Sequence, residues 1–182
     1  VAAPGGGACQ FSGNADCVDG PSTSAHDFSY SFAGTLTSCQ SNVGTPSSGT
    51  ISAGKTIVIA GVTYVEPASV GTGDCASNST SGTAVVRWVD GTFTLLDYST
   101  TSAAAGVVLQ ATVRPSIVVQ SVDSTTSTTI TSTRFRGASA DGLLAFEASP
   151  FECAGAGVFS AGLAGVAGIG TTRQTPSRSR VR

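Results

Sequence analysis

The sequence alternates apolar and polar residues with a period of two, and this pattern constrains the fold more than any other feature. Residues 28–37 place Phe28, Tyr30 and Phe32 on one face and serines and threonines on the other. Because successive side chains of a strand point to opposite faces, this segment predicts a strand whose aromatic face is buried. No helical apolar spacing holds over three turns. The nearest segment, 161–169, contains three glycines, each costing about 1 kcal/mol in a helix, so it predicts a buried strand of small residues.

The same reasoning predicts a fold built from strands alone. Further strands are expected at 56–65 with an interruption at Gly61, and at 85–96, 107–114, 117–119, 125–136, 142–146 and 157–169. No helical crossover supports parallel pairing, so we expect an antiparallel β-sandwich or barrel of about nine strands, with the choice between the two left open. A length of 182 residues suits one domain. We place that domain at 25–170, after a Gly- and Ser-rich arm at 1–24 and before a basic tail at 171–182.

Asp90-Gly91 lies between two strand-like runs and is typical of a two-residue type I′ hairpin, in which both central residues have positive φ. That turn pairs Trp88 with Phe93, and Val86 with Leu95. We therefore expect these four apolar side chains to share one buried face.

Cysteine is frequent for a chain with one histidine and no methionine. The five cysteines predict a disulfide framework, which persists in oxidising surroundings, so we expect a secreted protein, extracellular or at the cell surface. We expect Val1 to be a mature N-terminus left after removal of a signal peptide, with a fragment boundary as the alternative. No run of about 18 apolar residues occurs, so no membrane span is expected.

Several landmarks resemble a group of small secreted actinobacterial proteins built from β-strands. They are Cys39, Cys75, the Trp-x-Asp-Gly-Thr hairpin at 88–92, Arg-Phe-x-Gly at 134–137, and Cys153 before a Gly-rich closing strand. The resemblance covers most of residues 17–170 and implies an exported all-β domain with a Cys39–Cys75 bridge. It implies no activity. The second N-terminal cysteine and the arginine tail depart from the group's pattern.

The residues alone leave the disulfide pairing open, because five cysteines form two bridges in fifteen ways, five choices of spare times three pairings. With Cys39–Cys75 taken from the resemblance, Cys153 pairs with Cys17 or with Cys9. If Cys17 is taken, Cys9 beside three glycines is the spare thiol, free or bonded to another chain.

Few residues suggest catalysis or a metal. His26 could serve as a general base of a hydrolase, but Asp27 is adjacent on an extended segment and points to the opposite face. Residues 14–20 carry three oxygen-bearing side chains without the spacing of a calcium loop. Glu147 and Glu152 have the wrong separation for a glycosidase pair on one face. We therefore expect no enzyme, no cofactor and no metal site.

The remaining candidates concern binding. Tyr64 and Tyr98 are candidate ligand-facing aromatics for a glycan, whereas Trp88 is expected in the core. Four of the nine basic residues are arginines after position 172, which leaves an acidic body and excludes nucleic acid as a partner. Two functions are expected to compete. The first is a non-enzymatic structural protein that associates with copies of itself or another extracellular protein through its arms and sheet edges. The alternative is a monomeric binding module for carbohydrate or cell-wall polymer.

Overall fold

The structure, a computed structural model, describes residues 6–42, 44, 46–103 and 106–170 and has the predicted all-β, antiparallel fold. The basic tail and Val1 lie outside these residues. One short helix, α1 (Pro150–Ala154), accompanies thirteen described strands. The strands are β1 (Gly7–Val18), β2 (His26–Ser41), β3 (Gly49–Ala53), β4 (Thr56–Ile59), β5 (Val62–Val65), β6 (Ser69–Gly73), β7 (Ser77–Trp88), β8 (Phe93–Ala103), β9 (Gly106–Arg114), β10 (Ser116–Ser121), β11 (Ser127–Thr131), β12 (Ser139–Glu147) and β13 (Ser160–Ile169).

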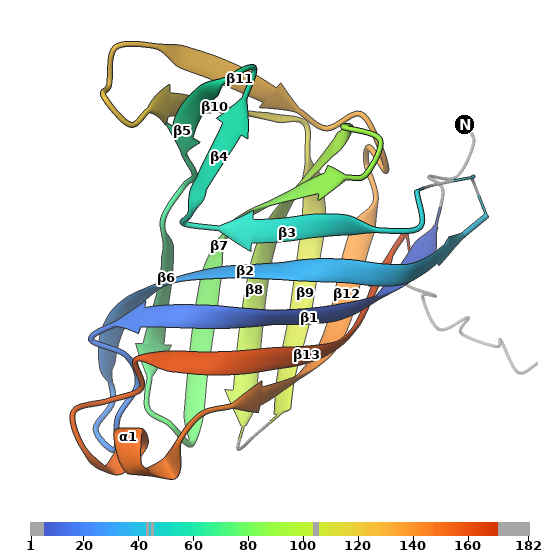
Figure 1. Cartoon of the computed structure of the whole chain (residues 1–182). Helices are drawn as coiled ribbons and strands as arrows, with labels where there is room; N and C mark the ends of the chain where they lie inside the picture. The colour runs from blue at the N-terminus through green and yellow to red at the C-terminus, as the bar shows by residue number, and fades with distance from the viewer. Residues whose placement is uncertain (1–5, 43, 45, 104–105, 171–182) are drawn as a thin grey trace, which may run out of the picture.

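The larger sheet closes into a barrel, which settles the choice that the sequence left open. Its strand order is β1-β13-β12-β9-β8-β7-β3-β2, and β1 pairs with β2 to complete the circle. β3 and β6 share one position between β2 and β7, with β3 pairing one half of each neighbour and β6 the other half. Figure 1 shows the barrel strands wrapping around a common interior, with α1 at the lower end. Closure gives each barrel strand two neighbours and removes the free edges that an open sheet would have.

The N-terminal arm predicted at 1–24 is wrong for residues 7–18, which form β1. This strand pairs with β13 from Gly7 to Asp16 and with β2 from Gly7 to Val18, so it is one of the strands that form the barrel wall. Alternate residues of β1 are buried, including Phe11 and Ala15. The prediction failed because glycines and small polar residues, which are typical of loops, occupy the strand positions that face outward or meet a neighbour closely.

A smaller sheet, β11-β10-β5-β4, lies at the upper end of the molecule in Figure 1 and packs on the outside of β7 and β8. Between the two sheets lies an outer cluster of buried side chains: Ile57, Tyr64, Val85, Leu95, Ile117, Val119 and Ile130. β4 and β5 join through Ala60-Gly61, where both residues have positive φ, so the predicted interruption at Gly61 is a two-residue hairpin turn.

The β7–β8 hairpin differs from its prediction by one residue. Arg87 pairs with Phe93 and Val86 with Thr94, and only Gly91 of the turn has positive φ. The Asp90 carboxylate accepts hydrogen bonds from the Thr92 backbone N–H and hydroxyl and pairs with Arg134, which stabilises the longer turn. A shift of one residue reverses the faces, so Trp88 and Val86 point into the barrel, whereas Phe93 and Leu95 join the outer cluster.

Candidate functional site

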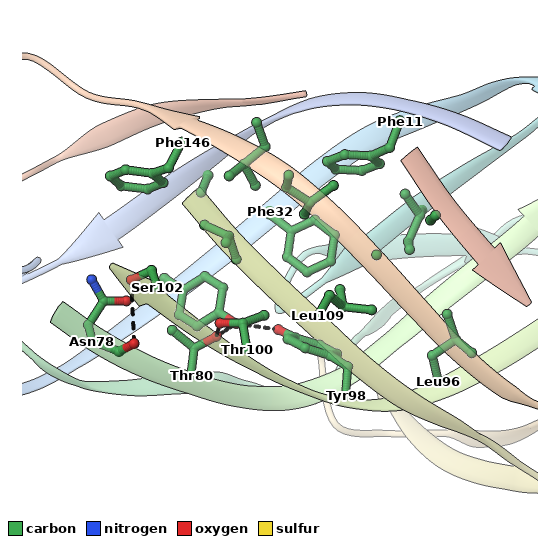
Figure 2. Close-up of a pocket in the computed structure, with 18 of the residues that line it drawn as sticks. Phe11, Phe32, Asn78, Thr80, Leu96, Tyr98, Thr100, Ser102, Leu109 and Phe146 are labelled. Carbon is green, nitrogen blue, oxygen red and sulfur yellow. Dashed lines mark hydrogen bonds between the residues drawn. The ribbon is translucent and has the colours of Figure 1, made fainter. Parts of the chain in front are cut away.

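The barrel interior contains a cavity of about 120 Å³. Period-two alternation brings inward-facing residues from the whole circle of strands to its wall. The wall is aromatic on one side, where Phe11 lies edge-to-face with Phe32 at 6.3 Å between ring centroids, and Phe32 lies edge-to-face with Tyr98 at 5.8 Å. Figure 2 shows these rings pointing into a common space together with Leu109 and Phe146.

Small residues on the opposite wall explain why this space is not filled. The inward positions of β12 and β13 include Ala140, Gly142 and Ala167, all of which line the cavity. Leu109, Leu144 and Leu163 point inward but are only partly buried, as expected for side chains next to unfilled volume. The predicted small-residue strand at 161–169 is thus β13, although it is less buried than expected because one of its faces points to solvent.

A chain of five hydroxyl groups crosses one part of the wall. The oxygens of Tyr30 and Tyr98 lie 2.5 Å apart, and those of Tyr98 and Ser69 lie 2.9 Å apart. On the other side, the Tyr30 oxygen lies 2.9 Å from that of Thr80, which lies 2.7 Å from that of Thr100. The series runs Ser69, Tyr98, Tyr30, Thr80, Thr100. Ser69 is fully buried, whereas the other four residues line the cavity, and the links around Tyr98, Thr80 and Thr100 can be followed in Figure 2.

The electrostatics of the cavity favour uncharged groups. Among the described residues, none that lines it carries a formal charge at neutral pH. Burial is the main cause that raises the pKa of Tyr30 above its ordinary value, and burial likewise raises the pKa of Tyr98 strongly. Both phenols therefore stay protonated and act as neutral hydrogen-bonding groups.

The end of the barrel near Trp88 is packed. Phe135, held at a φ of 58°, lies 5.9 Å from Trp88 between ring centroids, and Trp88 Nε1 donates to Thr94 Oγ1 at 3.0 Å. Residues 132–136 thus leave β11 to cover this end, so the strand predicted at 125–136 ends early, at Thr131. Only a smaller space of about 50 Å³ remains here.

The end near α1 is built from loops and lies next to the larger cavity. Cys17 and Pro21 line the cavity on this side, and the Pro21 carbonyl accepts a hydrogen bond from the Val158 N–H at 3.0 Å. A disulfide between Cys75 and Cys153 ties the turn after β6 to α1. The loops at this end are therefore joined to one another covalently and by hydrogen bonds.

Both disulfides differ from the expected ones. Cys9 pairs with Cys39, and Cys75 pairs with Cys153, while Cys17 is free. The expected Cys39–Cys75 bridge cannot form, because Cys39 lies near the end of β2 whereas the Cys75 N–H bonds to Ser22, before β2 begins. Cys9 is not a spare thiol because β1 lies beside β2, and a bulge there places Cys9 opposite Cys39.

The free Cys17 thiol is poorly reactive. Its pKa is raised to about 11, mainly by burial and to a smaller extent by the carboxylates of Asp16 and Glu152. A thiolate is the reactive form, so little of this cysteine is nucleophilic at neutral pH.

The two candidate tyrosines lie in different regions of the molecule. Tyr98 faces the cavity and belongs to the hydroxyl chain, whereas Tyr64 is buried in the outer cluster. Neither forms an exposed platform for a glycan. Tyr30, which was expected on an inward face, forms a hydrogen bond with Tyr98. Ser69, Thr80 and Thr100 were not predicted from the sequence as site residues, because nothing beyond strand alternation distinguishes them from other serines and threonines.

The remaining candidates are not assembled into a site. The two ring nitrogens of His26 contact the backbone carbonyls of Ser24 and Asp19 at 2.8 and 2.9 Å. Asp16, from the oxygen-rich segment 14–20, forms an ion pair with Lys55 at 2.5 Å. Glu147 and Glu152 lie on β12 and α1 respectively.

No group of three or more His, Cys, Asp or Glu side chains in the described ranges could hold a metal ion. Within the same ranges, no helix is long and apolar enough to cross a membrane. The chain matches no protein-family model, no curated protein and no solved structure.

Proposed function

We propose that the protein binds a small, uncharged and largely apolar molecule inside its barrel. The observation that carries this proposal is the interior cavity of about 120 Å³, lined by aromatic and aliphatic side chains and a short row of hydroxyl groups. Mostly apolar cavities with a few converging polar groups are typical of small-molecule sites, and eight-stranded barrels are wide enough to hold one small ligand. The proposal keeps the binding module expected from the sequence and replaces a surface glycan with an interior ligand.

The free energy of an empty cavity supports an occupant. Unfilled core volume costs about 24 cal/mol per Å³, so a space of this size corresponds to about 3 kcal/mol. Larger side chains on β12 or β13 would recover part of this, yet the chain carries alanine and glycine there. A ligand that fills the space would recover the same free energy on binding.

We further propose that the protein works outside the cell. Two disulfides among the described residues support this, because such bonds persist in oxidising compartments. An extracellular carrier or sensor of small molecules needs no catalytic group.

Toluene is a direct probe of the cavity because it has one ring and no polar group. Isothermal titration or chemical-shift titration of the purified protein is expected to show saturable binding. Leu109→Trp, which fills the cavity from β9, is expected to abolish binding, whereas Val108→Trp on the outward face of the same strand is expected to preserve it. Absence of toluene binding to the unmodified protein, or equal loss in the two variants, would contradict the proposal.

Self-association with a second copy is the other candidate function. Val108, Leu143 and Val166 are direct cross-strand neighbours on the outside of β9, β12 and β13, and they are 46%, 69% and 55% exposed. Three adjacent exposed aliphatic residues favour a contact between two such faces. Light scattering after size-exclusion chromatography should show a dimer that Leu143→Lys converts to a monomer. A monomer at high concentration before substitution would exclude this candidate.

A further inference from the structure

The hydroxyl chain specifies the ligand more narrowly than the cavity alone. We propose, building on the interior-binding function above, that the ligand is a neutral alcohol or phenol of about six or seven non-hydrogen atoms, whose hydroxyl group bonds to Thr100.

Size sets the upper limit. An apolar protein cavity of about 150 Å³ is known to hold one benzene molecule, and the space here is about 120 Å³. A single ring with one small substituent therefore fills it. A long acyl chain or a fused-ring system would need the barrel wall to move.

Within the chain of five hydroxyls, hydrogen counting points to Thr100 as the group left to meet a ligand. The five hydroxyls hold five hydrogens, and their four contacts use four of them. The O–H of Tyr30 is directed at Thr80 and that of Tyr98 at Ser69, yet each phenol has a single hydrogen. The contact between the two phenols requires one of them to donate to the other, and then either Thr80 donates to Tyr30 or Ser69 donates to Tyr98. When the hydrogens all point along the series from Ser69, the remaining one lies on Thr100, which lines the cavity.

When the hydrogen bonds of the chain run in the opposite direction, Thr100 offers the ligand an acceptor in place of a donor. If each hydroxyl donates toward Ser69, Thr100 donates to Thr80 and its oxygen is left with lone pairs that can accept a hydrogen bond. Thr100 can therefore donate to or accept from a ligand, and a hydroxyl group, which does both, matches either direction. An apolar ligand would use neither property.

The absence of charge around the cavity excludes ions. None of the described residues that line it is charged, so a carboxylate or ammonium ligand would lose its hydration without gaining an ionic partner. The phenols of Tyr30 and Tyr98 cannot compensate by ionising, because burial raises the pKa of both. The site thus selects neutral molecules over their charged analogues.

The test compares toluene and phenol, which are nearly equal in size, with the somewhat larger anion benzoate, by calorimetric titration at pH 7. Phenol is expected to bind about tenfold more tightly than toluene, the fold-change of one net hydrogen bond, and benzoate is expected not to bind. Thr100→Val should reduce phenol affinity to that of toluene while leaving toluene affinity unchanged. Thr101→Val, on the outward face of β8, is the matched control and should change neither affinity.

The outcomes separate this inference from the function on which it rests. Equal affinities for toluene and phenol would overturn the hydroxyl selectivity and leave interior binding intact. If the unmodified protein binds neither toluene nor phenol, interior binding itself is overturned. Thr100→Ser keeps the hydroxyl and should retain the phenol preference, so a loss of preference in this variant as large as in Thr100→Val would contradict the assignment to Thr100.

Discussion

The molecule has two apolar regions that share the wall formed by β7 and β8 and differ in how they are filled. The outer cluster packs aliphatic side chains such as Leu95 and Val119 between the barrel and the smaller sheet, and both of these residues are almost completely buried. The inner region has larger rings, including Phe11 and Phe32, yet it retains open volume and partly accessible leucines. Adjacent residues of one strand point to different regions: Leu95 packs in the outer cluster, whereas Leu96 faces the inner region.

This contrast indicates different roles for the two regions. Close packing in the outer cluster leaves no space for a guest and gives its side chains a stabilising role. Open volume with a chain of hydroxyls in the inner region forgoes some stability and provides a place for a ligand.

Removal of the Cys75–Cys153 disulfide should affect the inner region most. Replacing both residues with alanine is expected to lower the free energy of unfolding by about 4 kcal/mol, because the bond spans 78 residues of chain. The loops at the α1 end would also loosen, so toluene should leave the cavity faster. Denaturant unfolding and exchange broadening in NMR spectra measure the two effects.

The other disulfide supplies the control. Replacing Cys9 and Cys39 with alanine should lower stability by a comparable amount, since that bond spans 30 residues, but it lies away from the α1 end. Equal acceleration of toluene release by both double variants would show that the α1 end has no special relation to the cavity.

Truncation of one leucine in each region gives the most direct energetic comparison. Leu95→Ala is expected to lower the free energy of unfolding by about 3 kcal/mol, because Leu95 is fully buried and its loss leaves a new hole. Leu109→Ala should lower it by about 1 kcal/mol, since its side chain already borders open space. Urea titration distinguishes the two values, and a loss for Leu109→Ala as large as that for Leu95→Ala would contradict an unfilled interior.

The free thiol reports access to the inner region. A pKa of about 11 for Cys17, against 9.0 ordinarily, reduces its thiolate about 100-fold at pH 8. Its reaction with an aromatic disulfide reagent should therefore be about 100-fold slower than that of an exposed cysteine and should rise about tenfold per pH unit up to about pH 11. Rapid labelling at pH 8 would show that the α1 end is open.

A pH effect is expected outside the barrel cavity and is the smallest of the set. Glu66 is buried between β5 and β6, where it accepts hydrogen bonds from Ser52 Oγ at 2.6 Å and the Lys55 N–H at 3.1 Å, and burial raises its pKa. A raised pKa in the folded state means that folding is favoured below about pH 4.5 and that this contribution is lost as pH rises through the folded pKa. Unfolding measured between pH 4 and 8 should show this loss in the unmodified protein and not in Glu66→Gln. Identical pH profiles would contradict the assignment.

Much of the fold could be predicted from the sequence because alternation is a local property. Phe28, Tyr30 and Phe32 face inward as the pattern of 28–37 requires, and β13 is the predicted small-residue strand. Register was less predictable. The Asp90-Gly91 turn has one more residue than expected because Arg134, far away in sequence, holds it, and the slip moved Phe93 to the outer cluster.

The candidate site depended on contacts that no local pattern contains. Tyr30 and Tyr98 are 68 residues apart, and their hydroxyls meet because the register of the neighbouring strands β2, β6, β7 and β8 aligns them in one row. Cys9 meets Cys39 because β1 pairs with β2, which is the pairing that closes the barrel. The local pattern therefore predicted most strands but missed β1, β3 and β6, and it predicted strand partners poorly.

If the inner region is the binding site, toluene occupies it and does not enter the outer cluster. Nuclear Overhauser contacts between toluene protons and protein methyl groups measure this directly. We expect contacts from toluene to Leu109, Leu144 and Leu163, which line or border the cavity, and none to Ile117, Val119 or Ile130 in the outer cluster. Contacts to the outer cluster, or none to either region at saturating toluene, would contradict the account.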